Sequence, residues 1–278
     1  MQVAKTAERI GDMMVERKTA LAHKNNFGGV RPYSAIKYIV IHFTANDGDT
    51  DEANAKYFQT ERIPRASAHV FVDDNSITNS VPHNYVAYSV GGKKYSDCAQ
   101  TGGGKLYGTV TNTNSINIEM CDTIKDGKHN VSDKTLQNTI ELCRELMQKY
   151  NIDIDHVIRH FDVNGKHCPV YFMDESAWEG FKIRVMGYDF KVNKSYITTQ
   201  ACYLRISPGI GNNKVNYSAI SDAVKKKCRS KSGLAVFKKE KRFRLMKVQR
   251  NGSDLWGRMK SGYWIPLVYN GNVRAKNK

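Results

Sequence analysis

The sequence predicts an α/β fold, a mixed β-sheet flanked by helices, followed by a small all-β domain. Three observations support this prediction. Residues 36–43 form a β-branched and aromatic run that is apolar on both alternating faces, as in a strand that is covered on both sides. Apolar residues after Ser132 recur at helical spacing. From about Met186 onward, short strand-like runs alternate with turn signals.

The first elements in chain order are typical of a sheet with covering helices. The run at residues 36–43 is expected to be a central strand, and Asp51 can cap a short helix through Phe58. Residues 68–74 and 76–81 predict two paired strands. Residues 91–114 are rich in Gly, Lys, Tyr, Thr and Asn, which predicts a long surface loop of the kind that is often functional.

The next elements complete the α/β pattern. Residues 115–121 alternate strictly, so Glu119 points away from the apolar face of its strand. Ser132 can cap an amphipathic helix with the apolar stripe Leu136, Ile140, Cys143, Met147 and Tyr150. Residues 156–161 predict a short strand that delivers His160 into a loop.

The two ends of the chain differ from this pattern. Residues from about 6 to 23 have helical composition, and a breaker cluster follows at 25–29. This pattern predicts a short helical extension at residues 1–30. The runs after Met186 predict a small barrel or sandwich. Residues 218–232 interrupt these runs with a polar, Lys-rich insertion that can be a short helix or a loop.

Charge divides the chain at the same place. The 278 residues include 43 Lys and Arg against 27 Asp and Glu, a formal net charge of +16. Residues 186–278 hold 21 of the basic and four of the acidic residues, a balance of +17, whereas residues 1–185 have a balance of −1. We therefore predict a helical extension at 1–30, an α/β domain at 31–185 and a basic all-β domain at 186–278.

Composition also excludes several classes of protein. A hydrophobic content of 40% with 25% charged residues excludes a chain that is disordered throughout. No apolar run approaches the roughly 18 residues of a membrane span. Charges at Lys5, Glu8, Arg9 and Asp12 interrupt any secretory signal, so synthesis in the cytoplasm is expected. Six Cys without a CxxC pair favour a reducing compartment over a disulfide framework.

Five residues of the α/β domain form a candidate catalytic constellation: His42, Glu119, His160, Lys166 and Cys168. Zinc prefers His nitrogen and Cys thiolate, and a catalytic zinc site keeps one position for water. His42, His160 and Cys168 can supply such a set. Taken singly, each residue has an ordinary structural explanation, and five other histidines compete for the role of ligand: His69, His83, His129, His156 and His167.

Four segments, in order, resemble the motifs of a known enzyme family: YIVIHFTA, SAHVFVDD, NSINIEMC and RHFDVNGKHCP. They are similar to those of the zinc-dependent N-acetylmuramoyl-L-alanine amidases of the type-2 group, which includes many phage endolysins and shares its fold with peptidoglycan recognition proteins. The resemblance covers about residues 34–181. It implies a mixed sheet flanked by helices, with zinc in an open cleft.

The resemblance also implies a role for each residue. His42, His160 and Cys168 are the implied zinc ligands, Glu119 the implied general acid and base, and Lys166 the implied partner of the negative oxygen in the tetrahedral intermediate. The implied reaction is peptidoglycan hydrolysis, as by an endolysin or autolysin. The bond cleaved is the amide between the lactyl group of N-acetylmuramic acid and the L-Ala of the stem peptide.

Two departures from the family pattern affect the cleft. Some members have Tyr before the His of the second motif, where this chain has Ala68. Many members have an aromatic-His pair where this chain reads Ala87-Tyr88-Ser89. The first departure disfavours a tyrosine-assisted variant of the reaction, so Glu119 carries more weight here. The second affects the expected substrate contacts of the cleft wall but not the metal ligands. We expect His69 to be a substrate-binding residue of the cleft rather than a metal ligand.

The C-terminal domain resembles a bacterial SH3-type domain, a module that commonly targets lytic enzymes to cell walls. The segments that carry the resemblance are ACYLRISPGIGNNKV, LAVFKKEKRFRLMKVQ and LWGRMKSGYWIPLVY. The insertion at 218–232 is atypical of these domains. Four aromatic residues can line a groove for peptide or glycan, although Trp264 is expected in the core: Tyr203, Trp256, Tyr263 and Trp264.

The resemblances together imply a modular zinc amidase whose partner is peptidoglycan. The expected target is a Gram-positive cell wall, which the protein would reach after holin-type release or lysis. Membrane insertion and nucleic-acid binding are not expected. One alternative is a non-catalytic peptidoglycan receptor, but receptors of this fold often lack the Cys that is present here as Cys168. A further alternative is nucleic-acid binding through the basic domain, since a pI near 9.5 is its electrostatic footprint.

Overall fold

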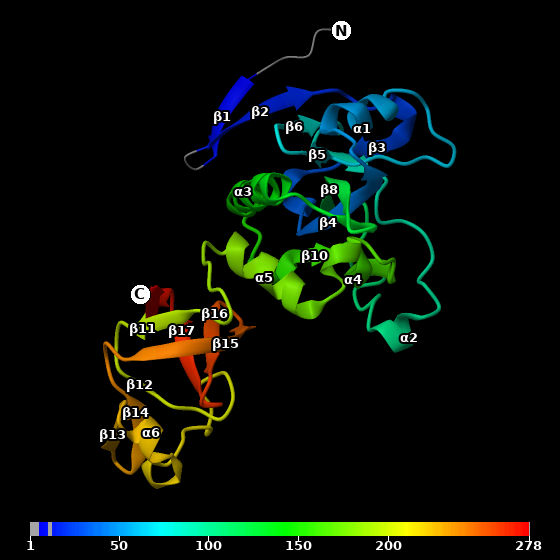
Figure 1. The fold of residues 1–278 in the computed structure, drawn as a ribbon. Helices are drawn as coiled ribbons and strands as arrows, with labels where there is room; N and C mark the ends of the chain where they lie inside the picture. Colours follow the sequence, from blue (N-terminus) through cyan, green and yellow to red (C-terminus); the bar gives the residue numbers. More distant parts are fainter. Residues whose placement is uncertain (1–5, 11–12, 278) are drawn as a thin grey trace. The chain divides into compact units, whose positions relative to one another are not determined.

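The computed structural model describes residues 6–10 and 13–277. The chain divides into two compact units, Met1–Gly187 and Tyr188–Lys278 (Figure 1). The first unit mixes helices and strands, and the second consists mainly of strands. Among the described residues, no helix is both long and apolar enough to span a lipid bilayer.

An eight-stranded mixed sheet forms the frame of the first unit. Its strands follow the order β1-β2-β6-β5-β8-β4-β10, and β9 pairs with β8 beside this path. β8 runs parallel to both of its neighbours in that order, β5 and β4, and β4 runs parallel to β10. The strands are Thr6–Ile10 (β1), Met13–Thr19 (β2), Tyr38–Asp47 (β4), Val70–Val72 (β5), Ser76–Asn79 (β6), Ser115–Lys125 (β8), Lys128–Asn130 (β9) and Val157–Arg159 (β10). A separate two-stranded sheet joins Phe27–Val30 (β3) and Tyr85–Ala87 (β7).

Helices and a long loop cover both faces of this sheet. The α-helices are Asp51–Tyr57 (α1), Cys98–Thr101 (α2), Asp133–Tyr150 (α3), His160–Asn164 (α4) and Glu175–Val185 (α5). Short 3₁₀ turns occur at Lys24–Asn26, Tyr33–Ala35, Ile154–His156 and Val170–Phe172. Ser132 caps α3 as predicted, its side chain accepting a hydrogen bond from the backbone of Thr135. The predicted apolar stripe of α3 packs on the sheet, joined by Leu142 and Leu146.

Alternation along β4 and β8 decides where the functional side chains lie. Ile39 and Ile41 of β4 belong to the core beneath α3, whereas Val40 packs on the opposite face with Val163 of α4. Because successive side chains of a strand point to opposite faces, His42 shares the face of Val40. On β8, Ile116, Ile118 and Met120 face α3 in the same way. The polar residues of both strands are therefore collected on the face opposite α3.

The prediction of a helical extension at residues 1–30 was wrong for the described residues. β1 and β2 form an antiparallel pair, and β2 then adds to the sheet parallel to β6. Val15 is buried in the core, and Arg17 Nη2 lies 2.6 Å from Glu145 Oε2 on α3. Strand pairing and burial against the sheet stabilise this segment as strands and override its helical composition. Composition does not reveal these tertiary contacts.

Two further boundaries differ from the sequence predictions. Thr50, not Asp51, caps α1, and Asp51 is the first helical residue, buried at 1% exposure. His160 does not lie in a loop but begins α4 directly after β10. The paired strands expected at 68–74 and 76–81 are present as antiparallel β5 and β6.

The second unit is a small, mostly β structure. Its strands are Ser195–Thr198 (β11), Cys202–Tyr203 (β12), Cys228–Lys231 (β13), Leu234–Phe237 (β14), Arg242–Asn251 (β15), Asp254–Met259 (β16), Trp264–Tyr269 (β17), Asn272–Val273 (β18) and Ala275–Asn277 (β19). They form a six-stranded sheet, β18-β17-β16-β15-β11-β19, and a three-stranded sheet, β12-β14-β13. The insertion at 218–232 contains the 3₁₀ turn Tyr217–Ala219, the short helix Asp222–Lys225 (α6) and β13. Trp264 is buried at 7% exposure, as expected.

Candidate metal centre

Two neighbouring strands place His42 beside Glu119. The two residues are register partners across the parallel pair β4 and β8. Residues directly opposite each other in a sheet share a face, so their side chains project together. His42 Nδ1 lies 3.8 Å from Glu119 Oε1. Sheet register alone thus brings these two candidates together from positions that are far apart in the sequence.

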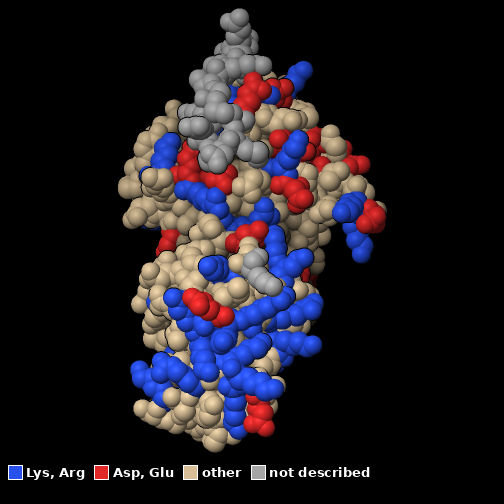
Figure 2. Space-filling model, turned by 60° about the vertical axis from the view of Figure 1, so that its left-hand side comes forward, with Lys and Arg blue, Asp and Glu red and all other residues tan. Residues whose placement is uncertain are grey.

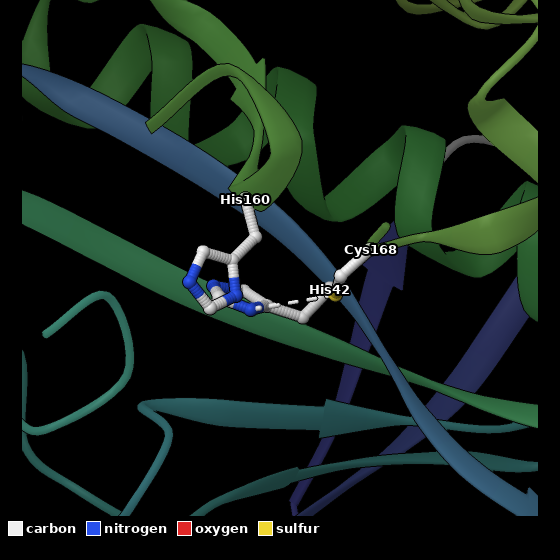
Figure 3. Close-up of side chains that lie close together, drawn as sticks. All are labelled: His42, His160 and Cys168. Atoms are coloured by element: carbon white, nitrogen blue, oxygen red, sulfur yellow. Dashed lines mark hydrogen bonds between the residues drawn. The ribbon is translucent and has the colours of Figure 1, made fainter. Parts of the chain in front are cut away.

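A tight turn after α4 adds His160 and Cys168. Gly165 ends α4 in the left-handed region with φ 93°, a conformation that favours glycine, and the chain then folds back. The backbone N–H of Phe161 donates to the carbonyl of Cys168 at 3.0 Å, which closes the turn. Candidate ligand atoms of His42, His160 and Cys168 all lie within 4.8 Å of one another (Figure 3).

The chemistry of these three side chains fits a metal ion. Both ring nitrogens of His160 are buried without a hydrogen-bond partner among the described residues. Burial lowers the pKa of His42 to about 4 and that of His160 to about 2, so both rings are neutral and offer lone pairs. Cys168 Sγ lies 3.8 Å from His42 Nδ1. Burial also raises the pKa of the Cys168 thiol, so metal binding has to displace its proton.

Asn117 orients one of the candidate ligands. Its Oδ1 accepts a hydrogen bond from His42 Nε2 at 3.0 Å, which leaves Nδ1 as the unprotonated nitrogen facing Cys168. The Asn117 amide in turn donates to Ser115 Oγ at 3.2 Å. Asn117 is not among the site residues that the sequence predicts. The strict alternation of residues 115–121 nevertheless indicates its position, because it puts Asn117 on the same face as Glu119.

Glu119 stands between the three buried side chains and an open cleft. The cleft has a volume of about 620 Å³ and is lined by Glu119, Lys166 and residues of β4 and α1. Burial, with the nearby carboxylates Asp49 and Asp122, raises the pKa of Glu119 to about 8, and the positive charge of Lys166 opposes this shift. Glu119 Oε2 has no hydrogen-bond partner among the described residues. The side chain as a whole is 21% exposed and lines the cleft, so a molecule bound there can contact it.

The structure does not place His69 in the cleft, which corrects the sequence prediction. His69 is fully buried, with 0% exposure. Its Nδ1 accepts from the backbone N–H of Asn117 at 3.1 Å, and its Nε2 donates to the carbonyl of Tyr85 at 3.2 Å. His69 thus braces the strand that carries Asn117 and does not reach substrate.

The other competing histidines also have partners outside the cluster. His83 Nδ1 bonds to Tyr150 Oη at 2.7 Å. His129 and His156 pair with Asp122 and Asp153 at 2.5 and 2.8 Å. His167 is exposed and lies 3.7 Å from Asp97. Among the described residues, His42, His160 and Cys168 are the group arranged to hold a metal ion.

The loop at residues 91–114 braces the turn that carries His160 and Cys168. Backbone N–H groups of Tyr95, Gly104 and Leu106 donate to carbonyls of α4 at 2.8 to 2.9 Å. At Gly103 a Cβ atom would lie 2.6 Å from the Phe161 ring, so only glycine allows this approach. The sequence predicted the loop but not this supporting role.

Comparison with known proteins identifies a family for this chain. Residues 32–171, half of the chain, match the family model described as N-acetylmuramoyl-L-alanine amidase. The chain is 35% identical over 154 residues to the N-acetylmuramoyl-L-alanine amidase BlyA of Bacillus subtilis (strain 168), covering 54% of this chain and 41% of the relative. It is 32% identical over 148 residues to the N-acetylmuramoyl-L-alanine amidase CwlL of Bacillus licheniformis, covering 52% of this chain and 39% of that relative. The chain therefore spans less than half the length of these two relatives.

Among solved structures, a mutant endolysin from Bacillus subtilis matches with 27% sequence identity and a TM-score of 0.47. The match covers 62% of this chain and 99% of that structure.

Proposed function

Because the chain belongs to the N-acetylmuramoyl-L-alanine amidase family, we propose that its first unit hydrolyses the amide between N-acetylmuramic acid and the L-Ala of the stem peptide. The observation that carries this proposal is the cluster of His42, His160 and Cys168 directly beside Glu119 at the edge of a cleft. The presence of Cys168 in that cluster favours an enzyme over a non-catalytic receptor of the same fold.

We infer that His42 Nδ1, one ring nitrogen of His160 and Cys168 Sγ hold a zinc ion. Two neutral imidazoles and a thiolate are the donors that zinc prefers, and a set of three leaves a position open. Bound zinc supplies Lewis acidity toward water and toward the substrate carbonyl at neutral pH. The buried, unpartnered nitrogens of His160 support this assignment, because buried polar atoms without partners are rare in folded proteins.

Glu119 and Lys166 perform the remaining steps on the cleft side. A cation held by the neighbouring cluster would favour the charged form of the Glu119 carboxyl. Glu119 could then accept the proton of the attacking water and deliver it to the nitrogen of the departing L-Ala, the work of a general base and acid. The C–N bond breaks as the tetrahedral intermediate collapses. Lys166 is exposed on the same cleft, where its ammonium can stabilise the negative oxygen of that intermediate.

For the second unit we propose attachment to an anionic cell wall through a bacterial SH3-type domain. Lys and Arg gather over a broad area of this unit (Figure 2). On β15, Arg242 and Arg244 are exposed on one face, and Lys247 pairs directly across from Arg258 of β16. None of these four takes part in an ion pair among the described residues. Like charges directly opposite each other in a sheet repel and are destabilising. A bound polyanion would neutralise this repulsion, which supports the proposal that this surface binds an anionic polymer.

Mass spectrometry of digested Gram-positive walls tests the catalytic proposal. The expected products are new free L-Ala amines with intact glycan strands. The Glu119→Gln variant, which keeps the shape of the side chain, is expected to bind zinc as the parent does and to lose about 10² to 10⁴-fold in activity. Undiminished activity in this variant, or cleaved glycan strands in place of free amines, contradicts the proposal.

Retention measurements test the second unit. The full chain is expected to bind purified walls more tightly than DNA at equal salt, with binding that weakens as salt rises. Replacing Arg242, Arg244 and Lys247 by Gln is expected to weaken wall retention. Stronger retention on DNA instead favours the nucleic-acid alternative.

A further inference from the structure

A small cavity in the second unit has the features of a ligand site. Its volume is about 230 Å³, and it lies among residues of β12, β16, β17 and the segment before β19. The residues that matter for its chemistry are Tyr203, Arg205, Trp256, Pro266, Tyr269 and Arg274. It thus combines three aromatic rings with two guanidinium groups.

Arg205 is buried at this cavity and forms no ion pair with the residues that the structure describes. It is 7% exposed, and its guanidinium carbon lies 5.4 Å from the centre of the Trp256 ring. Its Nη1 donates to the Gly211 carbonyl at 3.2 Å and to Asn213 Oδ1 at 2.5 Å, both neutral acceptors. Burial lowers the pKa of Arg205. A buried cation without an anion is unfavourable, and a bound anion would relieve this.

Arg274 adds a second cation to the same wall. It is half-buried, and its side chain makes no hydrogen bond or ion pair with the residues that the structure describes. The acidic residues of the described part of the second unit are engaged elsewhere: Asp189 with Lys191, Asp222 with Lys225, Glu240 with Lys239, and Asp254 with the backbone of Asn270. Among the described residues of the second unit, no carboxylate forms an ion pair with either arginine, which leaves both cations open to a bound anion.

Trp256 lines the cavity and has an unused donor. Trp256 is 1% exposed, and its Nε1 is buried without a hydrogen-bond partner among the described residues. A buried Trp N–H usually has a partner. Tyr269 meets the Trp256 ring edge to face, with centroids 6.4 Å apart. The rings of Tyr203 and Tyr269 provide apolar surface next to these donors.

We propose that this cavity binds the free α-carboxylate at the end of a short wall peptide. A carboxylate can accept two parallel hydrogen bonds from a guanidinium group, and the aromatic rings can pack against the small side chain beside it. The volume is below the roughly 300 to 1,000 Å³ of whole-ligand pockets, so it accommodates a terminal residue rather than an entire ligand. This inference rests on the proposed function, in which the second unit binds the wall.

Titration of the full chain with three probes tests the inference. The probes are Nα,Nε-diacetyl-L-Lys-D-Ala, its C-terminal amide, and glycerol 3-phosphate. Binding is followed by the ¹⁵N–¹H signal of the Trp256 indole, identified by its loss in Trp256→Phe. The acid is expected to shift this signal saturably, and the amide to bind at least about tenfold more weakly, because it lacks the charge-assisted hydrogen bonds.

Two variants locate the site. Arg274→Gln is expected to weaken binding of the acid about tenfold or more, while Lys231→Gln, which removes the same charge from an exposed position on β13, leaves binding unchanged. Arg274 is preferred to Arg205, whose contacts with Gly211 and Asn213 hold a loop in place. Trp256→Phe keeps an aromatic ring, although a smaller one, and removes the donor, and it is expected to weaken binding measured by calorimetry.

Three outcomes overturn the inference: equal binding of acid and amide, unchanged binding in Arg274→Gln, or tighter binding of glycerol 3-phosphate, which identifies a phosphate ligand instead. The same preparation is assayed for release of L-Ala amines from walls. An active enzyme that binds no peptide refutes only the cavity site. An inactive enzyme that binds the peptide refutes only the proposed amidase activity.

Discussion

Asn117 Oδ1 accepts a hydrogen bond from His42 Nε2 at 3.0 Å, and this contact fixes which nitrogen of His42 faces Cys168. The two residues lie on neighbouring parallel strands, β8 and β4. A partner of this kind holds a ligand ring in one orientation and one tautomer, and thereby sets both metal affinity and selectivity.

Asn117→Ala is expected to lower zinc affinity about 10 to 100-fold, because His42 then loses the acceptor that keeps Nδ1 free for the metal. Competition with a chelator of known affinity measures this change. Asn75→Ala is the matched control, since Asn75 is exposed in the turn between β5 and β6. Equal zinc affinity in the two variants contradicts the orienting role.

Lys166→Gln is expected to reduce the rate of L-Ala amine release about 10² to 10³-fold with an unchanged zinc content, because an oxyanion partner acts in the transition state rather than on the metal. The neighbouring His167→Gln serves as control. His167 is exposed, lies 3.7 Å from Asp97 at the surface, and its ring centre lies 6.1 Å from that of Phe161. Loss of zinc in Lys166→Gln shows that the residue supports the fold of the turn and not the chemistry.

Gly103→Ala is expected to reduce activity about 10 to 100-fold, because the new methyl group displaces Phe161 and Gly165 and shifts the turn that carries His160 and Cys168. Gly29→Ala is the control, since a Cβ there meets nothing within 4 Å. Wall digestion and zinc stoichiometry are measured on both. If the two variants behave alike, the loop at 91–114 does not brace the metal centre.

Asp51 makes the stability of the first unit depend on pH. Burial and the neighbouring Asp73 raise its pKa from 3.8 to about 6, against hydrogen bonds from Thr78 and Ser76 that favour the charged form. The folded state therefore binds the proton more tightly than the unfolded chain does. This contribution to stability is complete below about pH 4 and is lost as the pH rises through about 6.

Asp51→Asn is accordingly expected to flatten the decline in the free energy of unfolding between about pH 4 and about pH 6. Urea titrations at several pH values measure it. Asp126→Asn is the control, because Asp126 is exposed in the turn after β8 and has a positive φ that Asn tolerates. A decline of the same slope in Asp51→Asn and in the parent refutes the assignment.

Leu146→Ala is expected to lower the free energy of unfolding by about 2 to 5 kcal/mol, because Leu146 is fully buried between α3 and the sheet. Gln148→Ala on the exposed side of the same helix is expected to change it by less than about 0.5 kcal/mol. Urea titration compares the two. A loss below about 1 kcal/mol at Leu146 would show that the helix is not packed as described.

Local patterns in the sequence determined much of the first unit. The strict alternation of residues 115–121 placed Glu119 opposite the apolar core, and the apolar stripe after Ser132 specified α3 and its buried face. The resemblance of four ordered motifs to an enzyme family implies the metal ligands and Glu119, and the structure brings these side chains together. The excess positive charge of the second unit follows from counting residues alone.

Only the tertiary structure decided features that depend on partners distant in the chain. The helical composition of residues 1–30 gave way to β1 and β2, because pairing with β6 and burial of Val15 depend on residues some sixty positions away. The sequence predicts His69 to be a cleft residue, whereas in the structure it is buried and bonded to Asn117 and Tyr85. The cavity around Arg205 and Arg274 likewise exists only where separate strands meet. Propensity and spacing record what a residue favours locally, whereas burial and hydrogen-bond partners are set by the fold.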